Sequence, residues 1–345
     1  MKRLILLLPI ILVMLTSGCS IPGFEWLTGD EVTEYEHDIL VIQDLRAIPD
    51  DVSPGQEFKI ISYIRNIGLE TIPQEGDDGI KHVDNKIVIE LYDYCRGAFE
   101  IVGTENKGMK CPGEPKIDRT SGTASCIVDK ILPGQTIEVD WTLRANSDIK
   151  VKTTCPVDGM KILVRYPFKT TSLTTISVMN AQEMQRQIEE GTFQSRGSSI
   201  TAGRGPIKPF ITVEDQQPIS QGSGSTVISL QVENKGSGFL ATPITEGEDS
   251  GRSSVILNNQ IEITMPPEFS IADGGDCNFQ ASQGTYKPKD PDGIRLIYGK
   301  SPKMFCSMAI KDNITPKEVT LHATVDVEYE YEFRDSVMVT ITPKI

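Results

Sequence analysis

The sequence predicts an all-β fold in which two tandem β-sandwich domains follow an N-terminal signal or anchor helix. Three observations support this prediction. Short runs of alternating apolar and polar residues recur along the chain, as strands with one buried face require. The 29 glycines and 21 prolines supply many turns. The strand-and-turn order of the first half also recurs in the second, and 345 residues suit two domains of ordinary size.

Residues 1–18 are predicted to form a signal peptide. Lys2 and Arg3 precede a mostly apolar run at 4–16, which is shorter than the ~20 residues of a membrane-spanning helix. The run ends in Thr16-Ser17-Gly18-Cys19, which resembles the lipobox of prokaryotic lipoproteins. That resemblance implies cleavage before Cys19 and lipidation of its thiol. An uncleaved signal anchor remains the alternative, because Thr16 occupies the position of the usual leucine.

Residues 19–37 are expected to be an acidic tether, and residues 38–179 the first β-sandwich. A strand at 58–64 begins after the turn Ser53-Pro54-Gly55 and leaves through Asn66-Ile67-Gly68. Four further alternating runs are predicted to be separate strands: 86–94, 137–143, 161–166 and 173–178.

Residues 180–207 are predicted to be a short helix and a flexible linker. Asn180 has the character of an N-cap, Glu183 completes a variant capping box, and Gly191 ends the helix. Met184, Ile188 and the preceding Val178 are expected to form its apolar edge. The Gly- and Ser-rich residues 195–205 follow as linker.

Residues 208–345 are predicted to repeat the first sandwich. The strand at 226–232 leaves through Asn234-Lys235-Gly236, the same Asn-x-Gly exit as in the first half. Residues 259–265 correspond to 86–94, and Val327-Glu328-Tyr329 corresponds to Val164-Arg165-Tyr166. About seven short strands per repeat, with turns between them, indicate a sandwich.

The strand-turn-strand pattern resembles the CARDB-like and wider immunoglobulin-like modules of prokaryotic surface proteins, archaeal ones included. The residues that carry it run from Ser53-Pro54-Gly55 to Gly68 and from Leu132-Pro133-Gly134 to Trp141, which would be the inward aromatic. The resemblance implies tandem immunoglobulin-like domains in a surface lipoprotein. It implies no catalytic residues.

Six of the seven cysteines follow residue 90, and an exported chain would oxidise them to disulfides. The second repeat has only two cysteines, and the repeat places a similarly spaced pair in the first. The pairs expected on this reasoning are Cys95–Cys126, Cys111–Cys155 and Cys277–Cys306. A Cys95–Cys155 bond stays open as an alternative, because immunoglobulin-like domains often bridge their two sheets.

The sequence predicts a binding or structural protein rather than an enzyme. His37, His82 and His322 have no neighbour at metal-ligand spacing, so we expect no metal and no cofactor. Acidic turns such as 290–293 could hold calcium but are better explained as solvated turns. A net charge of −14 argues against nucleic-acid binding.

The predicted function is that of a membrane-anchored module for structure, adhesion or assembly. It would sit on the outer face of the cytoplasmic membrane or in the cell envelope, with an envelope or surface protein as partner. A ligand- or glycan-binding lipoprotein, or an accessory subunit of an envelope complex, is the alternative.

Overall fold

The structure is a computed structural model that describes residues 37–74, 86–102, 108–118, 122–155, 159–222, 224–241, 252–253, 255–272, 276–282, 284–310 and 317–343. All of them belong to one compact unit, His37–Ile345. Strands dominate this unit, and its fold is all-β.

A twelve-stranded sheet extends through both halves of the unit. Its main path is β21 (Phe279–Ser282), β22 (Thr285–Pro288), β19 (Ile261–Thr264), β25 (Glu318–Val337), β11 (Met160–Met179), β4 (Ile87–Asp93), β8 (Thr123–Val128) and β7 (Glu114–Asp118). Beside this path lie β12 (Ser199–Ala202), β14 (Ile219–Ser220), β16 (Phe239–Ala241) and β17 (Arg252–Ser253).

Two smaller sheets form second layers on this large sheet. The first contains β1 (Leu40–Ile48), β3 (Glu57–Asn66), β9 (Thr136–Ala145), β5 (Phe99–Ile101) and β6 (Met109–Lys110). The second contains β13 (Ile207–Val213), β15 (Ser225–Asn234), β24 (Met304–Ile310) and β20 (Phe269–Ile271). Short pairings complete the set: β2 (Asp51–Val52), β26 (Thr340–Ile341) and β10 (Thr153–Thr154) in one sheet, and β18 (Val255–Ile256) with β23 (Ile294–Arg295) in another.

Each smaller sheet packs face to face on the large one, which makes the architecture sandwich-like. Trp141 of β9 is fully buried, and its indole Nε1 donates to the Ala124 carbonyl of β8 at 3.0 Å. Trp141 is therefore an inward aromatic, as the sequence predicts. In the other half, Thr174 Oγ1 of β11 donates to the Ile211 carbonyl of β13 at 2.7 Å.

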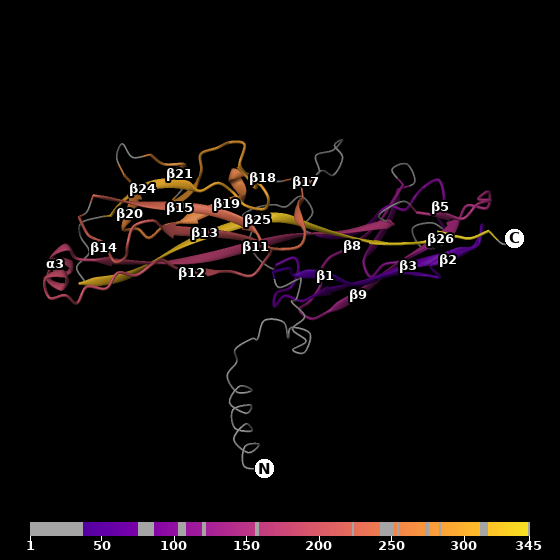
Figure 1. Ribbon diagram of the computed structural model, residues 1–345, viewed down its shortest axis with the longest axis horizontal. Helices are drawn as coiled ribbons and strands as arrows, with labels where there is room; N and C mark the ends of the chain where they lie inside the picture. The colour runs from indigo at the N-terminus through magenta and orange to yellow at the C-terminus, as the bar shows by residue number, and fades with distance from the viewer. Residues whose placement is uncertain are drawn as a thin grey trace, which may run out of the picture. The chain divides into compact units, whose positions relative to one another are not determined.

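The central feature of the large sheet is the antiparallel pair β11–β25, in which 20 residues of each strand are in register from Met160↔Val337 to Met179↔Glu318 (Figure 1). At the rise of a strand, this ladder is about 65 Å long. Even-numbered residues of β11 face the sandwich core along its whole length. The sequence runs predicted as two strands, 161–166 and 173–178, are thus one strand.

The strand order reads the same from either side of the β11–β25 pair. β4 pairs with β11 and β8 in one half, and β19 pairs with β25 and β22 in the other. The smaller sheets match as well, because β1-β3-β9 corresponds to β13-β15-β24. The two repeats are therefore related by an approximate two-fold axis that passes between β11 and β25.

The predicted domain boundaries at 179 and 208 do not separate two sandwiches. The second half of β11 pairs with β12 and β14 of the second repeat. In return, the last residues of β25 lie opposite Met160 and Ile162, and β26 pairs with β2 and β10 in the first repeat. Residues 199–202 of the predicted flexible linker form β12, because their backbone completes the edge of β11.

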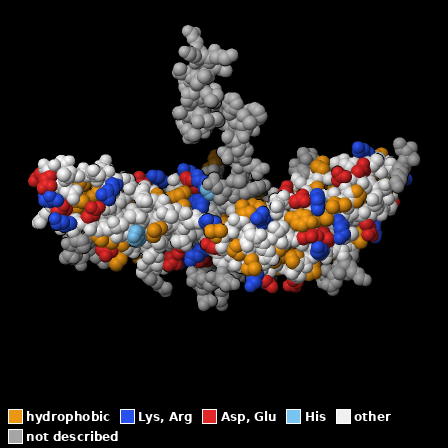
Figure 2. All heavy atoms as spheres, turned by 90° about the horizontal axis from the view of Figure 1, so that it is seen from below, with side chains coloured by type: hydrophobic (Ala, Val, Ile, Leu, Met, Phe, Trp, Pro, Cys, Tyr) orange, Lys and Arg blue, Asp and Glu red, His pale blue; other side chains and the backbone are white. Residues whose placement is uncertain are grey.

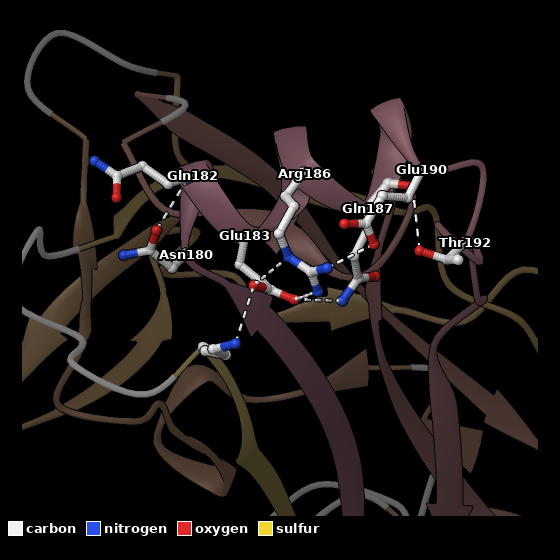
Figure 3. Close-up of polar contacts among 8 residues, drawn as sticks. Asn180, Gln182, Glu183, Arg186, Gln187, Glu190 and Thr192 are labelled. Carbon is white, nitrogen blue, oxygen red and sulfur yellow. Dashed lines mark hydrogen bonds and ion pairs between the residues drawn. The ribbon is translucent and has the colours of Figure 1, made fainter.

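The predicted helix is α3 (Ala181–Glu189), which connects β11 to β12 (Figures 1 and 3). Asn180 is its N-cap and accepts a hydrogen bond from Gln182 N at 2.9 Å. The capping box does not form, because the Glu183 carboxylate pairs with Arg186 at 2.6 Å and with Lys317 at 3.6 Å. The prediction of an apolar edge is also wrong, since α3 has no buried residue. Its stability comes from these polar contacts instead.

Candidate functional site

The region where the two repeats meet is built from the same turn used twice. In the first repeat, Asn66 Oδ1 accepts from Gly68 N at 2.9 Å, and Asn66 Nδ2 donates to the Glu70 carbonyl at 2.7 Å. In the second, Asn234 Oδ1 accepts from Gly236 N at 3.1 Å, and its Nδ2 donates to the Gly238 carbonyl at 2.8 Å. The Asn-x-Gly exits found in the sequence are thus structurally equivalent, because asparagine closes both turns with its own side chain.

Asp38 fixes the start of the described chain to the second repeat. Its carboxylate is buried and accepts hydrogen bonds from Ser237 N at 3.2 Å and Ser237 Oγ at 2.7 Å. Burial raises the pKa of Asp38, while the bonds from Ser237 and the nearby His37 act in the opposite direction. Asp38 thus contacts the second repeat, while the next two residues, Ile39 and Leu40, pair with the Asn66 turn of the first.

Aromatic side chains fill the core beneath this point. Tyr166 of β11 and Tyr331 of β25 are opposite each other in register, with ring centroids 5.9 Å apart in an edge-to-face arrangement. Tyr331 Oη accepts from Gly238 N at 2.7 Å, and the Tyr329 hydroxyl lies 2.8 Å from Thr170 Oγ1. Burial raises the pKa of all three tyrosines. They stay neutral at physiological pH and serve as packing groups with polar ends.

The opposite face of the β11–β25 pair carries charges. Arg165 donates from Nη2 to Glu332 Oε2 at 2.7 Å, and Arg334 Nε donates to the other oxygen of Glu332 at 2.6 Å. The side chains of Arg165 and Glu332 are only 8% and 2% exposed. The two-fold axis relates this pair to a second one, Lys169 and Glu328, whose Nζ and Oε1 atoms are 3.8 Å apart.

Glu90 of β4 is a partly buried acid near this pair. It accepts a hydrogen bond from Ser125 Oγ at 2.9 Å, and desolvation by burial raises its pKa despite that bond and the charge of Arg165. The Arg334 guanidinium is covered by two aromatic rings, with Tyr92 at 5.1 Å and Phe239 at 4.9 Å. These contacts hold strands together, and the charged groups already have partners within the protein.

The structure corrects two of the predicted disulfides. Cys95 is joined to Cys155, the alternative kept open above, and Cys111 is joined to Cys126. The cysteine pairing of the second repeat does not apply to the first. Cys126 lies on β8 of the large sheet, whereas Cys306 lies on β24, the equivalent of β9. The two cysteines are therefore not in matching places.

The third bond joins Cys277 to Cys306, the pair expected from the sequence. These residues form an antiparallel bridge with Cα atoms 3.9 Å apart. The first-repeat bonds also link separate parts of the fold: Cys111 follows β6 of the smaller sheet, and its partner belongs to the large sheet. Three disulfides are typical of proteins that fold outside the cytoplasm.

Several predicted features lie outside the described residues or find no site within them. Cys19 and His82 are outside the described residues, as is most of the signal peptide and tether prediction. Within the described part of the chain, no group of three metal-ligating side chains occurs, and no helix is long and apolar enough to cross a membrane. The Asp290 turn is closed by its own bonds, with Asp290 Oδ1 accepting from Asp292 N at 3.0 Å.

Sequence reasoning missed the Asp38–Ser237 contact and the Arg165–Glu332 pair. The match of 164–166 to 327–329 marked the right strands, but it gave no sign that these strands pair with each other. A cavity of about 10 Å³ between Ile211, Ile263 and Tyr286 in the second repeat has room for roughly one water molecule.

No protein-family model matches the chain, and no curated protein matches its sequence. A solved structure described as a membrane-anchored protein from Corynebacterium diphtheriae is 14% identical, with 85% of this chain and 82% of that chain covered and a TM-score of 0.18. The collagen adhesin of S. aureus is 9% identical, with 87% of this chain and 97% of that chain covered and a TM-score of 0.15. These scores are too low to establish a shared fold. The all-β, sandwich-like architecture is established here by strand pairing alone.

Proposed function

We propose that this chain is an extracytoplasmic structural or adhesion module, anchored to the membrane by lipidated Cys19 and carrying no catalytic activity of its own. The observation that supports it most directly is the β11–β25 ladder. It joins two sandwiches through 20 paired residues of each strand, so the repeats form one stiff body rather than two domains on a flexible linker.

Stiffness and covalent staples suit a protein that holds other components in place outside the cell. The β11–β25 ladder is continuous over about 65 Å, so its two ends keep a fixed distance from each other. Three disulfides add resistance to unfolding. The accessory subunit of an envelope complex is a special case of the same role.

Anchoring is tested by comparing the wild-type chain with Cys19→Ser in a bacterial host that processes lipoproteins. The wild type should partition with the membrane fraction and incorporate labelled fatty acid, and the variant should lose both properties. A Cys19→Ser chain that remains in the membrane would contradict lipidation and favour an uncleaved signal anchor.

The structural role is tested by crosslinking on intact cells, followed by identification of joined proteins. Recovery of the same envelope protein in independent experiments, abolished when the crosslinker is omitted, would support assembly. Native mass spectrometry of the purified full chain addresses the alternative. A stoichiometric small molecule or glycan retained in the spectrum would favour a ligand-binding lipoprotein.

A further inference from the structure

The turn between Ile297 and Lys300 presents a fully exposed aromatic side chain, Tyr298, next to Ile297, which is 55% exposed. Exposed apolar residues are common on protein surfaces. The face drawn in Figure 2 carries its hydrophobic side chains in small groups among charged ones. Exposure alone therefore does not distinguish Tyr298 from other surface residues.

The backbone of Tyr298 does distinguish it. Its φ is 51° and that of Gly299 is 77°, and Ile297 and Lys300 close the turn with backbone hydrogen bonds of 2.8 and 3.1 Å. A two-residue turn of this kind favours Asn-Gly, and a bulky residue with positive φ is strained. Because the side chain lies in solvent, no packing within the described unit compensates for the strain. Residues that keep such strain are concentrated at functional sites.

The turn is braced by the end of β15. The Gly299 carbonyl accepts a hydrogen bond from Asn234 N at 2.7 Å. Lys300 Nζ pairs with Glu233 Oε1 at 2.5 Å, and these two residues also form an isolated β-bridge. A braced turn presents its tip in one orientation, so little conformational entropy is lost when the tip makes a contact.

This turn lies where the chain enters the described unit. Asn234, which holds Gly299, also closes the turn that contains Ser237, and Ser237 donates to Asp38 at 2.7 Å. Asp38 is the second described residue, so the connection from residue 19 to the body passes through this point. In a chain anchored near its N-terminus, this is the part of the body that the anchor ties to the bilayer.

The charges in contact with the turn are compatible with a lipid surface. Lys235 and Lys300 both pair with Glu233, at 2.7 and 2.5 Å. The two lysine side chains are about half exposed, whereas the glutamate is largely buried between them. Two ammonium groups therefore share one covered carboxylate, and the exposed charge beside the turn is positive.

The net charge of −14 opposes the approach of the whole chain to anionic lipids. The nearest exposed acids along the chain are Asp290 and Asp292, six or more residues before Tyr298. Charges in solvent are screened over about 8 Å at physiological ionic strength. The lysines beside the turn therefore outweigh more distant acids at the point of contact.

We propose that Ile297 and Tyr298 insert into the interfacial region of the membrane to which the chain is anchored. Isoleucine supplies an apolar side chain, and a tyrosine ring combines an apolar body with a hydroxyl suited to the headgroup level. Lys235 and Lys300 would then face lipid phosphates. The proposal rests on the anchoring proposed above and adds an orientation to it, because a second contact restricts how the body turns on its anchor.

Two side chains hold a protein to a membrane only weakly by themselves. The anchor raises their effective concentration at the bilayer, so a weak contact is sufficient. A partner protein with an apolar pocket for the tyrosine ring is the competing occupant. It is less favoured because the turn lies beside the anchored end, where the bilayer is always within reach.

The test follows a tryptophan placed at the tip of the turn. Tyr298→Trp is made in a Trp26→Phe background, so that the fully buried Trp141 is the only other tryptophan. The full chain is placed in nanodiscs of phosphatidylcholine and phosphatidylglycerol. We expect strong quenching at position 298 by lipids that carry a doxyl group near the headgroup, and weak quenching by acrylamide from the water.

Val151→Trp in the same background is the matched control, because Val151 is an exposed apolar residue of the first repeat. It should show the opposite pattern, with acrylamide quenching several-fold stronger than at position 298 and no quenching by the doxyl lipids. Ile297→Asp, added to Tyr298→Trp, should reduce doxyl quenching several-fold because it places a charge at the contact. Ile188→Asp adds the same charge to the half-exposed Ile188 of α3 and should change nothing. Thermal melts by circular dichroism verify that each variant is folded.

Two outcomes overturn the proposal. Equal acrylamide quenching at positions 298 and 151, without doxyl quenching, would show that the tip is solvated. Protection from acrylamide without doxyl quenching would place the ring in a protein pocket instead of the bilayer.

Co-elution of the chain with the nanodiscs reports the anchor separately from the tip. A chain that does not co-elute would contradict the anchoring, and the same quenching measured with vesicles of these lipids at high concentration would then decide the insertion.

Discussion

Arg165 on β11 and Glu332 on β25 lie directly opposite each other and form a buried ion pair at the point where the two repeats are joined. Both Nε and Nη2 of the arginine donate to the same carboxylate oxygen, at 3.2 and 2.7 Å. Removal of Arg165 takes both hydrogen bonds from Oε2 of the buried Glu332 carboxylate, which then keeps only the bond from Arg334 to its other oxygen. We therefore expect Arg165→Met to lower the free energy of unfolding by about 3 kcal/mol in urea titrations.

The double variant Arg165→Met/Glu332→Leu should be more stable than Arg165→Met, because it also removes the buried carboxylate and leaves only Arg334, whose side chain is 25% exposed. The exposed pair Arg144–Glu57 provides the control, and Arg144→Met should cost less than about 1 kcal/mol. If Arg165→Met and Arg144→Met lowered the free energy of unfolding equally, burial would not explain the effect.

The pH dependence of stability should report the buried Asp38. In the folded chain the pKa of Asp38 is raised above 3.8, so the folded state holds this proton more tightly than the unfolded state. As the pH falls through the raised pKa toward 3.8, the wild type should gain stability relative to Asp38→Asn, which has no such titration. Urea unfolding at several pH values measures the difference.

Asp129→Asn is the matched control for that series, since it removes a negative charge from a side chain that is 86% exposed. A wild type that loses stability relative to Asp38→Asn over the same acid range would show that folding lowers the pKa of Asp38 instead of raising it.

Non-reducing peptide mapping should recover Cys95 joined to Cys155 and Cys111 joined to Cys126. Loss of the first bond in Cys95→Ala/Cys155→Ala should cost about 4 kcal/mol, since it closes the longer loop, and loss of the second about 3 kcal/mol. A peptide that joins Cys95 to Cys126 would refute this connectivity.

The turn at Tyr298-Gly299 offers a stabilising substitution. Both residues have positive φ, 51° and 77°, and the flanking Ile297 and Lys300 exchange backbone hydrogen bonds at 2.8 and 3.1 Å. Such a two-residue turn favours Asn-Gly, and the Tyr298 side chain is fully exposed. Tyr298→Asn should therefore add about 1 kcal/mol to the free energy of unfolding. Tyr298→Phe, which keeps the strain, should change little in the same thermal or urea measurement.

The first repeat should not fold alone. Residues 38–179 lack the end of β25 and all of β26, which pair with β11, β2 and β10. Expressed separately, this segment should show no cooperative thermal transition by circular dichroism, whereas residues 37–345 should unfold in one transition. A cooperative melt of 38–179 would contradict a shared sheet.

The repeat itself was predictable from the sequence, because local chemistry determines its turns. Asn66 and Asn234 each satisfy their turn with their own side chain, which leaves an Asn-x-Gly signature. The Asn180 cap was predictable for the same reason. The alternation of apolar and polar residues also predicted β3, β9 and β15 correctly.

Long-range pairing was not predictable in this way. Thr170 and Ser172 are buried polar residues in the middle of β11, and they interrupt the apolar pattern that would mark one continuous strand. The partner of Cys126 depends on which sheet β8 joins, and the spacing of cysteines does not contain that information. Whether Glu183 completes a capping box depended on the distant Lys317 and on Arg186, which compete for its carboxylate.

The palindromic strand order has a consequence for solubility. A single copy of either repeat would end in a long strand with one side unpaired, and such an edge is a template for uncontrolled association. Here each copy covers the edge of the other, within one polypeptide and in a fixed ratio. Duplication thus turns a strand edge that would favour aggregation into the β11–β25 pairing that joins the two repeats.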